Sequence, residues 1–204
     1  MQTLLLATRN PDKIKEIKQV LSHLPLKIIS AVDLKNLPEV VEDQPTLKGN
    51  AIKKATTLSK SSALLSLADD TGLQVDALDG APGVYSSRYA GERASYDDNV
   101  TKLLKEMQGV AENRRTARFR CVMALADGDK IETVEGVCEG LILKVKRGDK
   151  GFGYDPVFYT PVYNKSFAEI SLEEKNKISH RGIALDKIRT LLETKFSRGV
   201  AQPG

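Results

Sequence analysis

Near its N-terminus the sequence contains the stretch Thr3-Leu4-Leu5-Leu6-Ala7-Thr8-Arg9-Asn10-Pro11-Asp12-Lys13. The run from Thr3 to Ala7 predicts a buried strand, because a strand covered on both faces is apolar throughout. Asn10 is a favourable N-cap and Pro11 a favourable first helical residue, so a helix should follow at once. A strand, a short loop and a helix start bring free N–H groups and the positive end of the helix dipole together. The stretch therefore predicts an α/β fold with a phosphate site after its first strand.

The candidate phosphate site is the loop of Thr8, Arg9, Asn10, Pro11, Asp12 and Lys13, in which Thr8, Asn10 and Lys13 add side-chain donors. The loop lacks the glycines of a Walker loop. From this segment alone an ordinary N-cap followed by a solvated lysine is an equally good interpretation.

Composition indicates an ordinary globular chain of 204 residues, 41% hydrophobic and 28% charged. No apolar run approaches the length of a membrane span, and no signal sequence is recognisable, so we expect a cytoplasmic protein without a membrane partner. The net charge of +4 is spread along the chain, which argues against nucleic acid as a partner but suits a polyphosphate ligand. Cys121 and Cys138 show no metal or redox spacing, so we expect buried free thiols and no disulfide.

Strand and helix patterns alternate at first and then change character. After the first pair we expect strands at 27–29 and 64–68 and helices that begin after Thr46 and Ser95. Two β-rich runs, 115–126 and 130–145, are joined by Asp127-Gly128, which predicts a long antiparallel ribbon. Helices are expected to follow Ser171 and Ser179, with a frayed tail over 197–204. The absence of a long linker indicates a single domain, residues 1–204, with two lobes that share one sheet.

Two adjacent carboxylates, Asp69 and Asp70, follow the apolar strand 64–68. Because successive strand residues point to opposite faces, only one of the two is expected to face a cleft. Such an aspartate could bind Mg²⁺ or take a proton from water, and Thr71 could donate to a phosphate oxygen. The alternative is an Asx turn closed by Gly72.

Glu42 and Asp43 lie in a polar loop before the second predicted helix. Carboxylates of this loop could complete the oxygen ligands of a Mg²⁺ ion, which usually takes few carboxylates and several waters. A solvated acidic loop is the commoner case.

A second candidate segment is Gly151-Phe152-Gly153-Tyr154-Asp155-Pro156-Val157-Phe158. Its glycines permit close approach to a ligand, its rings can stack on a base, and its carboxylate can accept hydrogen bonds. Lys175, His180 and Arg181 lie near a predicted helix start, where they could bind phosphate or a base. A hairpin turn with core aromatics is the alternative for the first of these segments.

Taken together the segments resemble the Ham1-like inosine triphosphate pyrophosphatase family over nearly the whole chain. The resemblance rests on Thr8-x-Asn10-x-x-Lys13, Asp69-Asp70-Thr71-Gly72-Leu73, Gly80-x-Pro82-Gly83-x-x-Ser86-x-Arg88-Tyr89, Gly151 to Pro156, and Ser179-His180-Arg181. It implies an α/β fold with two lobes around a long mixed β-sheet, a central cleft and a homodimer. It also implies hydrolysis of ITP, dITP and XTP to the monophosphate and pyrophosphate.

The resemblance further implies roles for individual residues. Asp70 would be the catalytic base, and Glu42 and Asp70 would hold Mg²⁺. The substrate would be bound by Thr8 to Lys13, Thr71, Phe152, Gly153, Tyr154, Asp155, Lys175, His180 and Arg181. Two departures concern Thr71, where serine is frequent, and Lys48-Gly49-Asn50, where many relatives carry an acidic residue before the asparagine. The first departure keeps the hydroxyl, whereas the second removes a carboxylate that could support a metal.

Two other classes of protein remain as alternatives. A Maf-type pyrophosphatase would have a similar fold and reaction but other substrates, and the segments Phe152 to Asp155 and Ser179 to Arg181 argue against it. A non-catalytic nucleotide- or RNA-binding module is disfavoured by the aspartate pair.

Overall fold

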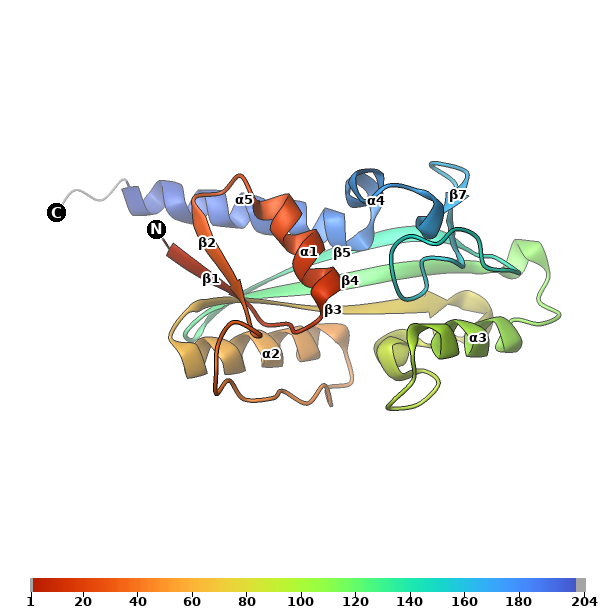
Figure 1. Cartoon of the computed structure of the whole chain (residues 1–204), viewed down its shortest axis with the longest axis horizontal. Helices are drawn as coiled ribbons and strands as arrows, with labels where there is room; N and C mark the ends of the chain where they lie inside the picture. The colour runs from red at the N-terminus through yellow and green to blue at the C-terminus, as the bar shows by residue number, and fades with distance from the viewer. Residues whose placement is uncertain (1, 201–204) are drawn as a thin grey trace. The chain divides into compact units, whose positions relative to one another are not determined.

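A computed structural model describes residues 2–200, which form an α/β fold (Figure 1). The strands are β1 (Gln2–Leu6), β2 (Leu26–Ser30), β3 (Leu65–Val75), β4 (Thr116–Asp127), β5 (Lys130–Ile142), β6 (Phe158–Thr160) and β7 (Lys165–Ser166). The α-helices are α1 (Pro11–Leu21), α2 (Leu47–Ser62), α3 (Tyr96–Glu106), α4 (Leu172–Ile178) and α5 (His180–Val200). Short 3₁₀ helices cover Asp76–Leu78, Gly83–Arg88, Glu112–Arg114 and Phe167–Glu169.

The strands form one mixed seven-stranded sheet in the order β2-β1-β3-β4-β5-β6-β7. Strand β1 is parallel to β2 and β3, and its Leu5 lies opposite Ile29 on one side and Ser66 on the other. The pairs β5–β6 and β6–β7 are antiparallel. The predicted α/β class and mixed sheet are therefore confirmed.

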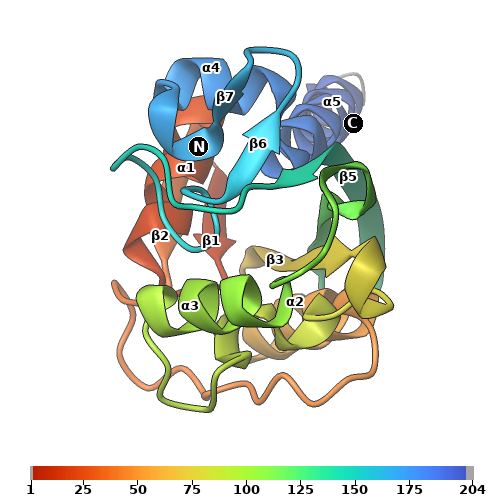
Figure 2. The ribbon, with the colours of Figure 1, turned by 90° about the vertical axis from the view of Figure 1, so that its right-hand side faces the viewer.

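The chain divides into two compact units. The first comprises residues 2–70, 122–135 and 181–200, and the second residues 71–121 and 136–180. Strands β3, β4 and β5 contribute residues to both units. Within the first unit, α2 covers one face of the sheet and α1 and α5 lie on the other (Figure 1, Figure 2).

The first unit has an aliphatic core whose centre is β1. Leu4, Leu5 and Leu6 are fully buried, as expected for a strand covered on both faces. The helices contribute buried aliphatic side chains to this core at helical spacing. They include Ile17 and Leu21 of α1, Ala51 and Ala55 of α2, and Leu185, Ile188 and Leu192 of α5. Helix α2 begins where predicted, because the Thr46 hydroxyl accepts the N–H of Gly49 at 3.0 Å.

The second unit has an aromatic core. The Phe119 ring lies 4.6 Å from that of Phe158 and 6.1 Å from that of Phe167. These rings join β4 and β6 to the 3₁₀ turn Phe167–Glu169. Offset and tilted ring pairs of this kind add specific contact energy to the burial of apolar area.

Three boundaries differ from those that the sequence predicted. Strand β3 continues to Val75 instead of ending at residue 68, because Leu73 and Val75 are fully buried in the second unit and the Leu73 N–H is bonded to Ser86 Oγ at 2.9 Å. The Asx turn considered at Gly72 is therefore wrong. The ribbon turn consists of Gly128 and Asp129, one residue later than predicted, since Gly128 takes the left-handed conformation with φ 61°. The ribbon's second strand ends at Ile142, not 145.

The ends of the chain leave one expectation open. Residues 197–200 belong to α5, whereas residues 201–204 lie outside the described residues, so the frayed tail stays a prediction. Among the helices that the structure describes, none combines the length and the hydropathy that a membrane span requires.

The two cysteines should be unreactive in the native protein. Both thiols are free and buried, which confirms the sequence expectation. Burial, together with the nearby Glu139 carboxylate, raises the pKa of Cys138 to about 11, so little thiolate exists at pH 8. We expect a disulfide reagent such as DTNB to label neither thiol within an hour at pH 8 in native protein and both in denaturant. Rapid labelling of native Cys138 would contradict this burial.

Candidate active site

The loop between β1 and α1 closes as a helix cap. Asn10 Oδ1 accepts the N–H groups of Asp12 at 2.9 Å and Lys13 at 3.3 Å, and Thr8 Oγ1 accepts the N–H of Asn10 at 3.2 Å. These three amides are thus occupied within the loop. Arg9 donates to the backbone oxygen of Leu37 at 3.5 Å. Any phosphate at this loop would therefore depend mainly on side-chain donors and on the helix dipole.

Lys13 points from α1 to the Asp69 carboxylate of β3, with Nζ 3.0 Å from Oδ2. The same oxygen lies 3.5 Å from Arg181 Nη2 at the start of α5. Arg181 Nη1 also donates to Glu16, one turn after Lys13 on α1. We call Lys13, Glu16, Asp69 and Arg181 the Asp69 cluster; it alternates two carboxylates with two cations at the face covered by α1 and α5.

Electrostatics keeps Asp69 ionised. Burial alone would raise the pKa of this carboxyl group, but Lys13, Arg181 and Lys54 outweigh it and hold the pKa well below its usual range. Asp69 is thus a permanent anion that holds Lys13 and Arg181 in place.

Asp70 points to the opposite side of β3, toward α2. Its Oδ2 accepts the side-chain N–H of Asn50 at 3.0 Å, and its Oδ1 lies 3.7 Å from Lys54 Nζ. Lys54 also donates to the Glu42 carboxylate and, at 2.6 Å, to the backbone oxygen of Asp69. We call Glu42, Asn50, Lys54 and Asp70 the Asp70 cluster. The prediction that the two aspartates diverge is confirmed.

The two carboxylates of β3 differ in acidity. Burial raises the pKa of Asp70, and the effect of Glu42 in the same direction offsets part of the opposing effect of Lys54. For Lys54, burial acts to lower the pKa, but Asp70 and Glu42 prevail and raise it. Asp70 is therefore the more easily protonated member of the pair, as a general base should be.

The carboxylates of the Asp70 cluster could supply oxygen ligands to a magnesium ion. Glu42 and Asp70 both approach the ammonium group of Lys54, so two carboxylates already converge on one cation. No group of three or more His, Cys, Asp or Glu side chains suited to a metal occurs within residues 2–195. Two carboxylates completed by water and phosphate oxygens fit Mg²⁺ better than a metal that needs a full protein cage. Asp43 instead pairs with Lys53 at 2.8 Å.

The segment Lys48-Gly49-Asn50, which departs from the expected pattern, is sterically restricted at Gly49. A Cβ atom on Gly49 would lie 2.8 Å from Gln44 Cβ, so an acidic side chain at this position would require the loop to shift. Gln44 is further held by its N–H bond to Asn50 Oδ1 at 2.9 Å. Asn50 thus ties the loop to Asp70.

In the second unit, the candidate base-side loop is organised by a buried ion pair. Lys175 Nζ lies 2.6 Å from Asp155 Oδ2, and the same oxygen accepts the Phe152 N–H at 2.9 Å. Lys175 also lies 4.9 Å from the centre of the Phe152 ring. Gly151 adopts φ 72°, and a Cβ there would lie 2.0 Å from Asp155 Oδ2, so this position requires glycine. Asp155 therefore shapes the loop as well as being a candidate ligand.

Two of the other predicted residues of this unit, Tyr154 and His180, have core contacts. The Tyr154 hydroxyl donates to the backbone oxygen of Ser86 at 2.9 Å, and its ring belongs to the hydrophobic core. The His180 ring stacks on Phe119 at 4.5 Å. Thr71 lies within β3 and is partly buried, and Gly153 adopts φ 62°. Their roles as substrate ligands stay predictions.

Three residues of the two clusters were not identified from the sequence: Glu16, Asn50 and Lys54. A usable signal was present for all three. Asn50 and Lys54 are four residues apart beside the apolar stripe of α2 and so share one helix face. Glu16 follows Lys13 by three residues in the same way. Polar residues on the buried side of a helix usually have a specific partner.

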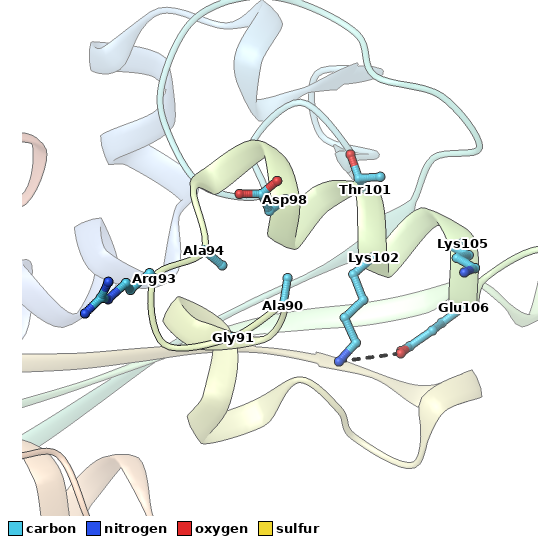
Figure 3. Close-up of a pocket in the computed structure, with 9 residues that line it drawn as sticks. All are labelled: Ala90, Gly91, Arg93, Ala94, Asp98, Thr101, Lys102, Lys105 and Glu106. Atoms are coloured by element: carbon cyan, nitrogen blue, oxygen red, sulfur yellow. Dashed lines mark ion pairs between the residues drawn. The ribbon is translucent and has the colours of Figure 1, made fainter.

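A separate pocket of about 820 Å³ occurs in the second unit between α3 and the loop before it (Figure 3). Its lining contains none of the candidate residues and consists of Ala90, Gly91, Arg93, Ala94, Asp98, Thr101, Lys102, Lys105 and Glu106. Lys102 pairs with Glu106 at 3.9 Å and donates to the backbone oxygen of Tyr89 at 2.7 Å. The lining of this pocket therefore shares no residue with the Asp69 cluster or the Asp70 cluster.

Comparison with known proteins agrees with this architecture. The Ham1 family model matches residues 4–191. A protein named dITP/XTP pyrophosphatase from Desulforamulus reducens is 50% identical over 95% of this chain and 96% of its own. A protein of the same name from Geobacter sulfurreducens is 49% identical over 91% of this chain and 94% of its own. The structure of a HAM1 protein from Coxiella burnetii aligns with a TM-score of 0.87 at 40% identity, over 95% of this chain and 100% of that chain. Matched over nearly its full length in sequence and in structure, the chain belongs to the Ham1 family.

Proposed function

We propose that this protein hydrolyses the triphosphates of deaminated purines, namely ITP, dITP and XTP, to the monophosphate and pyrophosphate. The observation that carries the proposal is the divergence of Asp69 and Asp70. One carboxylate anchors Lys13 and Arg181, while the other has a raised pKa beside Glu42 and Lys54. Removal of such nucleotides would keep deaminated purines away from polymerases.

The proposed reaction is attack of water on the α-phosphorus. The water oxygen bonds to the α-phosphorus, and Asp70 accepts the proton. The bond from the α-phosphorus to the bridging oxygen breaks, and the electron pair leaves with pyrophosphate. Lys13 offsets the growing negative charge of the leaving group. When bound at Glu42 and Asp70, Mg²⁺ would neutralise charge on the triphosphate.

Substrate selectivity tests the proposal most directly. Hypoxanthine and xanthine carry a 6-keto acceptor where adenine carries an amino donor, and one buried donor left unpaired costs about 1–3 kcal/mol. At least two such contacts would give rejection of ATP by about a hundredfold. GTP shares the 6-keto group and must be excluded through its 2-amino group. We expect kcat/KM for ITP and XTP to exceed that for ATP and GTP by about a hundredfold, with little dependence on the 2′-hydroxyl.

The measurement is a screen of nucleoside triphosphates in which pyrophosphate and orthophosphate are detected separately. Pyrophosphate from ITP, dITP and XTP supports the proposal. Comparable turnover of ATP, or stepwise release of orthophosphate, contradicts it. Other nucleoside triphosphates as the best substrates, with pyrophosphate as the product, would favour a Maf-type activity. Binding without turnover would favour a non-catalytic module.

We also propose that the protein is a homodimer, on the basis of the family resemblance, and that it is cytoplasmic. Light scattering coupled to size-exclusion chromatography measures the assembly, and a mass near 22.4 kDa would contradict the dimer.

A further inference from the structure

The first turn of α3 contacts the loop that carries Phe152. Tyr96 is the first residue of α3, and its ring centre lies 5.8 Å from that of Phe152, with the ring planes inclined by 40°. The next residue, Asp97, pairs with Lys146, which belongs to the same loop region as Phe152. Two consecutive residues of one helix therefore reach one loop.

This helix start is held rigidly. The Ser95 hydroxyl accepts the Asp98 N–H at 3.1 Å, and the Asp98 carboxylate accepts the Ser95 N–H at 2.8 Å, which completes a capping box. Val100 and Leu103 of the same helix are buried in the core of the second unit. A residue at the first position of such a helix keeps a defined place relative to that core.

The backbone and the ring of Phe152 are held by different groups. Asp155 fixes the backbone through the Phe152 N–H, whereas the ring is contacted by the Lys175 ammonium and by Tyr96. Lys175 is itself held by Asp155 and is 3% exposed, while Tyr96 is 44% exposed and joins the ring from α3. The Phe152 ring is partly buried, so a neighbouring ring limits the orientations that it can adopt.

We propose that Tyr96 is a positioning residue for Phe152 and thereby sets the affinity for the purine base. The inference rests on the proposed function and on the expectation from the sequence that the Phe152 ring stacks on the base. A stacking ring binds a base best when its orientation is already set. The entropy cost of restricting its rotamers then does not reduce the binding free energy. The contact between the two rings is the interaction through which Tyr96 acts on Phe152.

The test compares the affinities of two products, IMP and inorganic pyrophosphate, by isothermal titration calorimetry. We expect Tyr96→Ala to weaken IMP binding about three- to tenfold, the range of one aromatic pair, while pyrophosphate binding is unchanged. Tyr96→Phe should bind IMP like the wild type. With ITP as substrate, Tyr96→Ala should raise KM by a similar factor and change kcat less than about twofold.

Two further variants serve as controls. Tyr85→Ala removes an exposed tyrosine of the same unit that lies beside Arg88, and it should leave IMP binding unchanged. Phe152→Ala should weaken IMP binding at least as much as Tyr96→Ala. Should Tyr96→Ala not fold, Tyr96→Leu keeps the apolar volume without the ring and is expected to show the same loss.

The outcomes separate this inference from the proposed function. If the wild type neither hydrolyses ITP nor binds IMP, the proposed function fails and the inference with it. If Phe152→Ala weakens IMP binding and Tyr96→Ala does not, the function stands and the inference is overturned. Equal weakening of IMP and pyrophosphate, or a loss in Tyr96→Phe as large as in Tyr96→Ala, also overturns it.

Discussion

Asp70→Asn is expected to lower kcat for ITP by about a hundredfold or more while the protein stays folded. The substitution removes the proton acceptor and a metal-ligand oxygen but barely changes shape. Asn50 can still donate to the remaining side-chain oxygen, so the helix contact of the Asp70 cluster survives. The measurement is steady-state turnover of ITP with circular dichroism and thermal unfolding on the same sample.

Asp69→Asn is the matched control, one residue away on the other side of β3. It leaves the buried Arg181 and the partly buried Lys13 with one carboxylate fewer, and breaking a buried ion pair destabilises a protein by about 3 kcal/mol or more. We therefore expect a larger loss of thermal stability in Asp69→Asn than in Asp70→Asn. A folded Asp70→Asn protein with near-normal turnover would rule out Asp70 as the base.

Lys13→Ala is expected to raise KM for ITP and lower kcat together, each by about tenfold. The charge of the triphosphate is present in the bound substrate, which affects KM, and it grows on the leaving pyrophosphate, which affects kcat. Lys13 is suited to both roles because Asp69 holds its ammonium group at 3.0 Å while the side chain remains 17% exposed. Initial-rate kinetics over a range of ITP concentrations give both constants.

Lys15→Ala is the control for this substitution, since Lys15 lies on the same helix and is exposed. It should leave both constants unchanged. A rise in KM alone for Lys13→Ala would mean that Lys13 binds substrate and transition state equally. If neither constant moves, Lys13 serves only as part of the helix start that Asn10 caps.

Local features of the fold could be predicted because they depend on neighbours in the chain. Asn10 caps α1, Thr46 caps α2, and the Ser95 and Ser171 capping boxes open α3 and α4. The full burial of Leu4 to Leu6 follows from an apolar strand. The end of β3 could not be predicted in this way, because residues 71–75 continue the strand through burial in the second unit and a bond to Ser86.

The candidate site likewise combines features that the sequence determines with features that only the tertiary structure determines. By itself the sequence determined that Asp69 and Asp70 must point to opposite faces, since side chains alternate along a strand, and that Gly151 to Asp155 form a tight loop. Only the tertiary structure decided which partner each carboxylate meets: Lys13 and Arg181 for Asp69, Asn50 and Lys54 for Asp70, Lys175 for Asp155. These partners lie up to 112 residues away, and their pairing depends on how helices pack on a sheet, which no local pattern encodes. The raised pKa of Asp70 follows from that packing, because burial and the approach of Glu42 act on the carboxyl group only once the chain has folded.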